Sequence, residues 1–390
     1  MKTRIISFSY LLIILALFFY SFTQVDLSLT LSRVSIWQNI QKSFQYIGYF
    51  NRPLSTAIFL MIVLGMFSYY LYFLKKSLNK KFVNKDFFIL IILTTLILVI
   101  SYTAFSYDIF NYIFDAKIIT HYHQNPYIHK ALDYPGDPML SFMHWTHRVY
   151  PYGPIWLVLT VPISFIGSNI FLMTYFLFKI LIGGFYLGSV YLISKINKKI
   201  NPENPYFNLI FFALNPLVII ESLVSSHNDI AMIFFALLGI YLMTVNKKIF
   251  GIVLIVISAL IKIPTAALLL PGLLNIIPIR KLKLENSKFY LSVALISVLG
   301  IIYSMTKLEI QPWYFLWALP FIALLRPNKY IISLSIGISA GLLLRYSVFL
   351  FYGNWDGIAI FQRNLISLTM SILPIPLVFI YDIIKKSRWT

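Results

Sequence analysis

The sequence predicts an all-α fold, a polytopic transmembrane bundle of about 11–13 membrane helices. Of its 390 residues, 59% are hydrophobic and only 12% are charged, whereas a soluble domain carries about 25% charged residues. Apolar runs of roughly 20 residues recur from end to end, and each can cross about 30 Å of hydrocarbon. One polar stretch interrupts them. We therefore expect a single integral membrane domain over residues 1–390, with one large outer loop that carries short interfacial helices.

The expected helices follow the apolar runs in order. No small-x-small cleavage site follows the first run, so we interpret it as an uncleaved membrane helix rather than a signal peptide. Four segments (154–168, 249–261, 264–278 and 312–325) are too short to span at full thickness, and short, proline-interrupted segments usually line a cavity. The expected ranges are 5–23, 53–74, 87–105, 154–168, 170–194, 206–223, 228–245, 249–261, 264–278, 289–305, 312–325, 330–350 and 364–384.

Basic residues between these runs predict which loops face the cytoplasm. Those of the second loop place it inside, so helix 87–105 exits and the polar stretch lies outside. Counting back from the C-terminus agrees in part, and loops 306–312 and 351–363 then share the outer face. The basic residues used are Lys75, Lys76, Lys80, Lys81, Lys85, Arg280–Lys288, Arg326, Lys329, Lys385, Lys386 and Arg388.

One segment conflicts with this rule. If 154–168 and 170–194 both cross, then Lys195, Lys198 and Lys199 fall outside. Either 154–168 enters the membrane without crossing it, or the charge bias fails there.

The net charge of +19 would suggest nucleic acid in a soluble protein. Here the bases form short clusters beside apolar runs, so we expect cytoplasmic loops and anionic headgroups as their surroundings, and no nucleic-acid partner. The chain has no cysteine, which excludes disulfides, thiol catalysis and thiolate metal sites.

The polar stretch, residues 106–153, concentrates the groups that carry chemistry. Five of the six histidines and four of the thirteen acids lie in it. A membrane protein that gathers acids and imidazoles in one loop is expected to place its site there, so we interpret 106–153 as an outer catalytic loop.

Asp108 lies just past the outer end of helix 87–105. A half-desolvated carboxylate there would have a raised pKa, as a general base needs, and Tyr107, Phe110 and Tyr112 suit a sugar ring or an isoprenoid chain. Asp115, seven residues on, shares a helical face with Asp108 and could complete a two-carboxylate site. The alternatives are an interfacial acid within a tyrosine belt and an amphipathic helix that exposes its acids.

The histidines could form a metal site, because His121-x-His123 and His144-x-x-His147 have ligand-like spacing. No HExxH signature accompanies them. We predict no metal and no other cofactor, and favour phosphate or headgroup binding by the imidazoles.

Two motifs provide turns. Asn125-Pro126-Tyr127 and Pro151-Tyr152-Gly153-Pro154 combine fixed φ with tight bends, and Pro154 suits the first turn of a helix. These residues are expected to shape a site rather than react.

Polar residues also occur within apolar sequence. Asp229, in Ser226-His227-Asn228-Asp229, could orient a substrate hydroxyl or pair with a base; a helix cap by Asn228 is the alternative. Lys262 is a lone cation whose expected partner is an anion such as a lipid phosphate, unless it snorkels to the interface. Gln311-Pro312-Trp313-Tyr314 suits sugar stacking or an aromatic belt, and Arg345 and Arg363 are further candidate phosphate partners.

Taken in order, these residues resemble a known group. The end of the helix at Asp108, the two turn motifs, His227-Asn228-Asp229, the Lys262 segment and Gln311–Trp317 resemble the GT-C superfamily of polytopic glycosyltransferases. The chain is most similar to the bacterial polyprenol-phosphate-mannose-dependent α-mannosyltransferases. The resemblance covers roughly residues 87–325, which we expect to form a glycosyltransferase-like core.

The resemblance implies a mechanism and a location. A sugar, mannose by resemblance, moves from a polyprenyl-phosphate donor to a glycolipid or glycan acceptor on the extracytoplasmic face of the cell membrane. Asp108 would be the general base, inversion would follow at the anomeric carbon, Lys262 would face the donor phosphate and Asp229 would support it. The expected substrate-binding residues are Tyr112, Asp115, Asn125, Tyr127, Tyr152, His227, Asp229, Lys262, Gln311, Trp313 and Tyr314.

Two other functions share some of these features. A transporter or flippase of lipid-linked sugars would use the same basic and aromatic cavity, but inverted repeats would favour it and none is found. An acyl- or phospho-transferase should show a histidine–carboxylate pair at short spacing, which His227-x-Asp229 fits only loosely.

Overall fold

The computed structural model describes residues 2–78, 84–202, 204–276 and 286–387. In this part of the chain the structure is built from helices, with one isolated bridge between Lys130 and Val149 and no strand. The predicted all-α polytopic bundle is confirmed. Six helices are long and apolar enough to cross a membrane, seven if one bent pair counts as a single span, and six further apolar helices are shorter.

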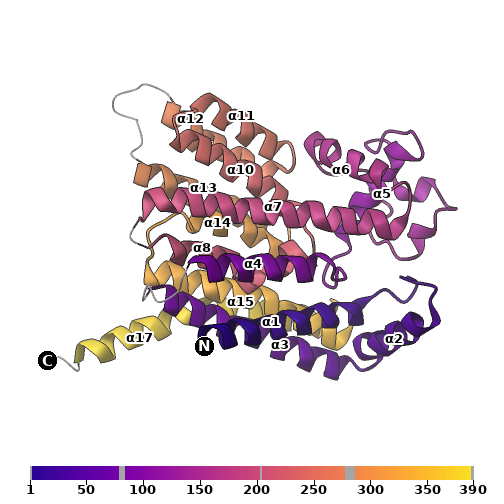
Figure 1. The fold of residues 1–390 in the computed structure, drawn as a ribbon, viewed down its shortest axis with the longest axis horizontal. Helices are drawn as coiled ribbons and strands as arrows, with labels where there is room; N and C mark the ends of the chain where they lie inside the picture. The colour runs from indigo at the N-terminus through magenta and orange to yellow at the C-terminus, as the bar shows by residue number, and fades with distance from the viewer. Residues whose placement is uncertain (1, 79–83, 203, 277–285, 388–390) are drawn as a thin grey trace.

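The helices run roughly parallel to one long axis (Figure 1). Their bounds are α1 (Lys2–Ser21), η1 (Phe22–Gln24), α2 (Ser35–Gln45), η2 (Tyr46–Phe50), α3 (Arg52–Leu78), α4 (Asn84–Val99), α5 (Asp108–Thr120), η3 (Ala131–Asp133), η4 (Pro138–Ser141), α6 (Pro154–Ile166), α7 (Phe171–Ile200), α8 (Pro205–Ala213), α9 (Pro216–Ile219), η5 (Ile220–Val224), α10 (Asp229–Thr244), α11 (Lys248–Ala259), η6 (Ile263–Leu268), α12 (Leu269–Ile276), α13 (Asn286–Met305), η7 (Pro312–Trp317), α14 (Leu319–Ile322), α15 (Lys329–Tyr352), α16 (Ile358–Ile372) and α17 (Pro374–Ser387).

The two ends of the bundle differ in composition. At one end, which we call the loop end, α2, α5 and α6 gather with the polar loop (Figure 1). At the other, the basic end, Lys75 and Lys76 close α3 and Lys198 and Lys199 close α7. Asn204, just after α7, donates to the backbone oxygen of Ser77 at the end of α3. These four lysines therefore lie at the same end of the bundle, whereas Lys80, Lys81, Arg280 and Arg388 lie outside the described residues.

The structure resolves the conflict at 154–168. α6 has 13 residues and lies beside α5 at the loop end, where it does not cross the bundle (Figure 1). α7 has 30 residues and alone brings the chain back to the basic end. Lys195, Lys198 and Lys199 therefore lie toward the same end of the bundle as Lys75 and Lys76.

Helix boundaries follow local sequence. Pro154 occupies the first turn of α6, where its missing N–H costs no hydrogen bond. The side chain of Asn328 caps α15 by accepting from the amides of Tyr330 and Ile331. Gly353 ends α15 at φ 78°, a left-handed conformation that favours glycine.

The span at 206–224 is broken. α8 and the helix formed by α9 and η5 meet at an angle of 52°, and Pro216 prevents α8 from continuing. The side chain of Asn215 accepts from the amide of Leu217 and so caps the second half. The break delivers η5 to the centre of the bundle, next to the loop end of α4.

Candidate active site

Asp108 is the first residue of α5. Its backbone amide donates to the Ser106 hydroxyl over 3.2 Å, and a carboxylate in the first turn is favoured by the helix dipole. The side chain remains 17% exposed. Asp108 therefore presents a carboxylate from a rigid helix end to the space in front of the polar loop.

A buried imidazole lies behind this carboxylate. His227 follows Ser226, which adopts φ 59°, in the turn between η5 and α10. Its Nδ1 lies 3.3 Å from Asp108 Oδ2, and its Nε2 lies 3.3 Å from Glu221 Oε2. The Tyr346 hydroxyl donates to the other oxygen of Glu221 over 3.1 Å. A chain of Tyr346, Glu221, His227 and Asp108 thus runs from the core to the surface of the site.

The two carboxylates set the protonation of His227. Burial alone would lower its pKa, but Asp108 and Glu221 together raise the pKa to about 9. At neutral pH the imidazole is therefore cationic, and both ring nitrogens can donate.

The same contacts correct one expectation. Burial alone would raise the pKa of Asp108, as the sequence suggested, but His227, Lys262 and the Tyr112 hydroxyl outweigh it and the pKa is lowered. Asp108 is thus held ionised. The sequence does not reveal this, because His227 is distant along the chain.

A second ion pair lies beside the first. Lys262 Nζ lies 2.9 Å from both carboxylate oxygens of Asp229, and Trp317 Nε1 donates to Asp229 Oδ1 over 2.5 Å. Asp229 is fully buried, whereas the Lys262 side chain is 20% exposed. Asp229 therefore pairs with a base, one of the two predicted roles. Asn228 does not provide the alternative cap, because its side chain accepts no amide of α10.

Aromatic rings wall the site. Tyr112 meets Tyr152 edge to face at 5.3 Å, Trp313 stacks on His227 at 4.1 Å, and Tyr314 stacks on Trp317 at 4.4 Å. Lys262 Nζ lies 5.8 Å from the ring centre of Tyr152. Such ring faces suit the C–H surface of a sugar and also stabilise a nearby cation.

The turn motif at 151–154 fixes one wall. The amides of Gly153 and Ile155 donate to the carbonyls of Ile261 and Leu260 over 3.1 and 3.2 Å. A Cβ at position 153 would lie 1.9 Å from the Leu260 oxygen. Only glycine allows this approach, which keeps Tyr152 against Lys262.

The other predicted substrate ligands are less central. Asn125 is exposed, and its side chain accepts from the Tyr127 amide, while the Tyr127 hydroxyl donates to the Tyr152 carbonyl. Gln311 precedes η7 and makes no capping hydrogen bond. Asp115 is buried, which raises its pKa to about 8, and it has no hydrogen-bond or ion-pair partner among the described residues. Asn125 and Tyr127 thus act on the site through the Tyr152 segment.

The loop histidines lie apart from one another. His144 stacks on Tyr107 at 3.7 Å, and His129 Nδ1 lies 3.6 Å from Asp133. Within the described ranges, no three histidine, aspartate or glutamate side chains are grouped as metal ligands.

Lys179 is a residue that the sequence analysis missed. Its buried side-chain nitrogen donates to the carbonyls of Leu223 and Val224 over 2.5 and 3.0 Å and to the Ser101 hydroxyl over 3.3 Å. Thr103 joins the same two loops, because its hydroxyl lies 2.7 Å from the backbone carbonyl oxygen of Ser106 and 3.2 Å from that of Ser225. The loop before Asp108 and the loop before His227 are thus held together.

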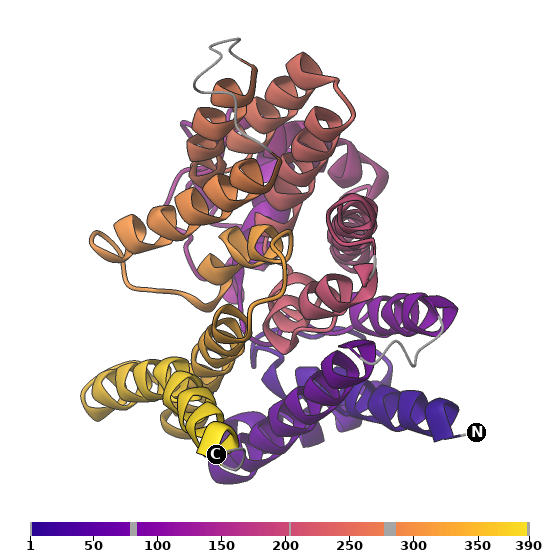
Figure 2. The ribbon, with the colours of Figure 1, turned by 90° about the vertical axis from the view of Figure 1, so that its left-hand side faces the viewer.

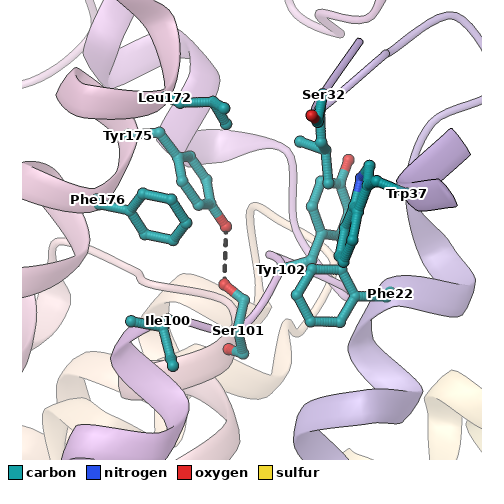
Figure 3. Close-up of a pocket in the computed structure, with 10 residues that line it drawn as sticks. Phe22, Ser32, Trp37, Ile100, Ser101, Tyr102, Leu172, Tyr175 and Phe176 are labelled. Carbon is teal, nitrogen blue, oxygen red and sulfur yellow. Dashed lines mark hydrogen bonds between the residues drawn. The ribbon is translucent and has the colours of Figure 1, made fainter. Parts of the chain in front are cut away.

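A small cavity of about 200 Å³ borders this anchor. Figure 3 shows Tyr175 and Phe176 facing Trp37, Tyr102 and Phe22 across it, with Ser101 at its base. The Tyr175 hydroxyl donates to the Ser101 carbonyl over 3.0 Å. Ser101 is therefore fixed by α7 through both its backbone and its side chain.

Glu221 and Trp317 were also missed. Glu221 is a single acid in an apolar run, a signal by which an intramembrane functional residue can be recognised. Trp317 lies within the Gln311–Trp317 motif, but only the fold shows that it reaches Asp229.

A comparison with protein families finds a match. A family model described as alpha-(1->6)-mannopyranosyltransferase, N-terminal domain, matches residues 16–278. The matched span contains Asp108, Glu221, His227, Asp229 and Lys262. No curated protein and no solved structure matches the chain significantly.

Proposed function

The chain belongs to the alpha-(1->6)-mannopyranosyltransferase family, and we propose that it moves mannose from a polyprenyl-phosphate donor to a glycolipid or glycan acceptor. The site lies at the loop end, opposite the basic end. Because basic ends of membrane proteins face the cytoplasm, we propose that transfer takes place on the extracytoplasmic face of the cell membrane.

The observation that carries the proposal is that Asp108 is held ionised with one carboxylate oxygen free. Its Oδ2 faces His227 and Tyr112, and its Oδ1 has no partner among the described residues. The cationic imidazole keeps the group ionised, as a base must be before it accepts a proton. The partial exposure of the side chain leaves Oδ1 open to an acceptor hydroxyl.

The proposed step is a direct displacement at the anomeric carbon. The acceptor oxygen bonds to the anomeric carbon while its proton passes to Asp108 Oδ1. The bond between the anomeric carbon and the phosphate oxygen breaks, and the phosphate leaves with the electron pair. Attack opposite the leaving group inverts the anomeric carbon.

The Lys262–Asp229 pair faces the donor in this proposal. A cation near the leaving phosphate stabilises the charge that develops as the bond breaks, and Lys262 is the exposed member of the pair. Tyr152, Trp313 and Tyr314 supply ring faces for the sugars.

The decisive experiment is transfer from radiolabelled polyprenyl-phosphate mannose to membrane lipids in inverted and right-side-out vesicles. Asp108→Asn should reduce transfer by about 10²-fold or more, the usual contribution of a general base, while the variant remains inserted. Asp133→Asn, a carboxylate at the same end but outside the site, is the matched control. Full activity of Asp108→Asn would refute the base assignment, and no transfer from any lipid-linked sugar would favour a transporter.

A further inference from the structure

A large apolar cavity lies outside the region described above. It has a volume of about 760 Å³ and is lined by α13, α15 and α16, with η7 and α14 at one side. Figure 2 shows α13, in orange, and α16, in yellow, reaching out on the same side of the molecule. Leu295, Ile302 and Leu368 line it and are more than half exposed, so the cavity opens to the surface that faces lipid.

The cavity is long. On α13 its lining runs from Leu291 to Met305, which at 1.5 Å per residue corresponds to about 21 Å. One leaflet contributes only about 15 Å of hydrocarbon. The cavity therefore suits a chain longer than the acyl chain of an ordinary phospholipid.

Two arginines lie at its outer end. Arg345 and Arg363 both contact one oxygen of Glu309, at 2.6 and 2.7 Å, with side chains 3% and 11% exposed. Arg345 also donates to the carbonyl of Ile310, which lines the cavity. The Arg363 Nε is buried and has no hydrogen-bond partner. Two cations and one anion leave an excess positive charge, and the unpartnered N–H needs an acceptor.

η7 joins this cluster to the candidate active site. Phe315 lines the cavity, while Trp313 and Trp317 of the same short helix contact His227 and Asp229. Burial, together with the charges of Asp229, Asp108 and Glu309, raises the pKa of the Tyr314 hydroxyl. The charged end of the cavity thus adjoins the reacting groups.

We propose that this cavity holds the polyprenyl chain of the donor and that Arg345 and Arg363 bind its phosphate, which takes the position of the Glu309 carboxylate. The inference rests on the proposed function and deepens it. Guanidinium groups match phosphate oxygens in pairs, and Glu309, 42% exposed, is free to leave. Lys262 contacts the same phosphate from the side of Asp229.

The test is binding of undecaprenyl phosphate to the full-length protein, followed by native mass spectrometry. It requires no turnover, so it can fail or succeed independently of the transfer assay. Arg363→Gln and Arg345→Gln should each weaken binding about tenfold, the effect of one charge-assisted hydrogen bond. Glu309→Gln should strengthen binding, because it removes the competing anion. Arg33 is an exposed arginine at the same end, and Arg33→Gln should leave the binding of undecaprenyl phosphate unchanged.

A chain-length comparison tests the cavity itself. Leu342→Trp should weaken binding of undecaprenyl phosphate more than binding of citronellyl phosphate, because a short chain does not fill the cavity. If Arg345→Gln does not fold, binding of undecaprenyl phosphate by Arg363→Gln and Glu309→Gln tests the proposal. Wild-type binding by Arg363→Gln, weaker binding by Glu309→Gln, or equal competition by phosphatidylglycerol would overturn the proposal.

Discussion

The imidazole of His227 lies 3.3 Å from the carboxylate of Asp108, although Asp108 begins α5 and His227 lies in the turn before α10. A cation in this position keeps the proposed base ionised and fixes one of its oxygens. Loss of the proton from His227 should therefore weaken its contact with Asp108, and a change of pH tests this.

Stability should depend on pH through His227. Its pKa is raised to about 9 in the folded protein, against about 6.5 when unperturbed. A raised pKa contributes stability that is fully present below about pH 6.5 and is lost as pH rises through about 9. The melting temperature of the wild type should therefore fall across this window more than that of His227→Gln. His129→Gln, a half-exposed histidine beside a carboxylate, is the control. Parallel pH curves for wild type and His227→Gln would contradict the assignment.

Loss of Lys262 should affect the donor more than the acceptor. Lys262→Met removes the exposed cation and leaves Asp229 buried without its counter-ion, so we expect a raised KM for the donor and a loss of about 3–5 kcal/mol of stability. In the double variant Lys262→Met/Asp229→Asn, stability should recover while the donor KM stays high. An unchanged donor KM in either variant would argue against contact with phosphate.

Gly153 provides a steric test. Gly153→Ala places a Cβ 1.9 Å from the Leu260 oxygen, which must push the Tyr152 segment away from Lys262. A displacement of about 1 Å near a site can reduce turnover about 10²-fold, and steady-state transfer would measure it. Gly136→Ala makes the same change in the same loop where no atom lies within 4 Å. Equal activity of the two variants would show that the contact is unimportant.

Lys179 is expected to position the site without touching substrate. Lys179→Met removes the donor to the buried carbonyl of Leu223, at a cost of about 1–3 kcal/mol, and leaves the Val224 carbonyl with only the Ser226 hydroxyl at 3.4 Å. The change loosens the loops before Asp108 and His227. We expect a lower kcat at nearly unchanged KM for both substrates, with partial recovery in Lys179→Arg. A lower melting temperature with full kcat would indicate a purely structural role.

Much of the fold follows from the sequence, because apolar runs of spanning length and clustered bases are local signals. The short segments were also recognised locally, from their length and from prolines such as Pro312. The break at Pro216 was not predicted, because 206–223 is one continuous apolar run and was expected to form a single helix. The path of 154–168 was not, because α6 is as apolar as a spanning helix. Only its packing against α5 shows that it stays at the loop end.

The sequence singles out several residues of the candidate site but not their arrangement. Asp108, His227, Asp229 and Lys262 attract attention as polar groups in apolar surroundings, so each could be named singly. Their pairing could not be predicted, because it depends on where η5 breaks and on how η7 packs. The pKa of Asp108 was misjudged for that reason, since the sequence shows its burial but not the imidazole behind it.

The order in which these contacts appear along the chain has a consequence for biosynthesis. The charged residues of the two ion-pair groups (Asp108, Glu221, His227, Asp229 and Lys262) are all made before residue 263. The uncharged donors Trp317 and Tyr346, which complete the hydrogen bonds of Asp229 and Glu221, come afterwards. During insertion, the charges of Asp108, Glu221 and Asp229 therefore gain their cationic partners early. The last hydrogen bonds to Asp229 and Glu221 form only when the C-terminal helices are added. A chain arrested after residue 278 would contain the residues of both ion pairs but would lack Trp317 and Tyr346.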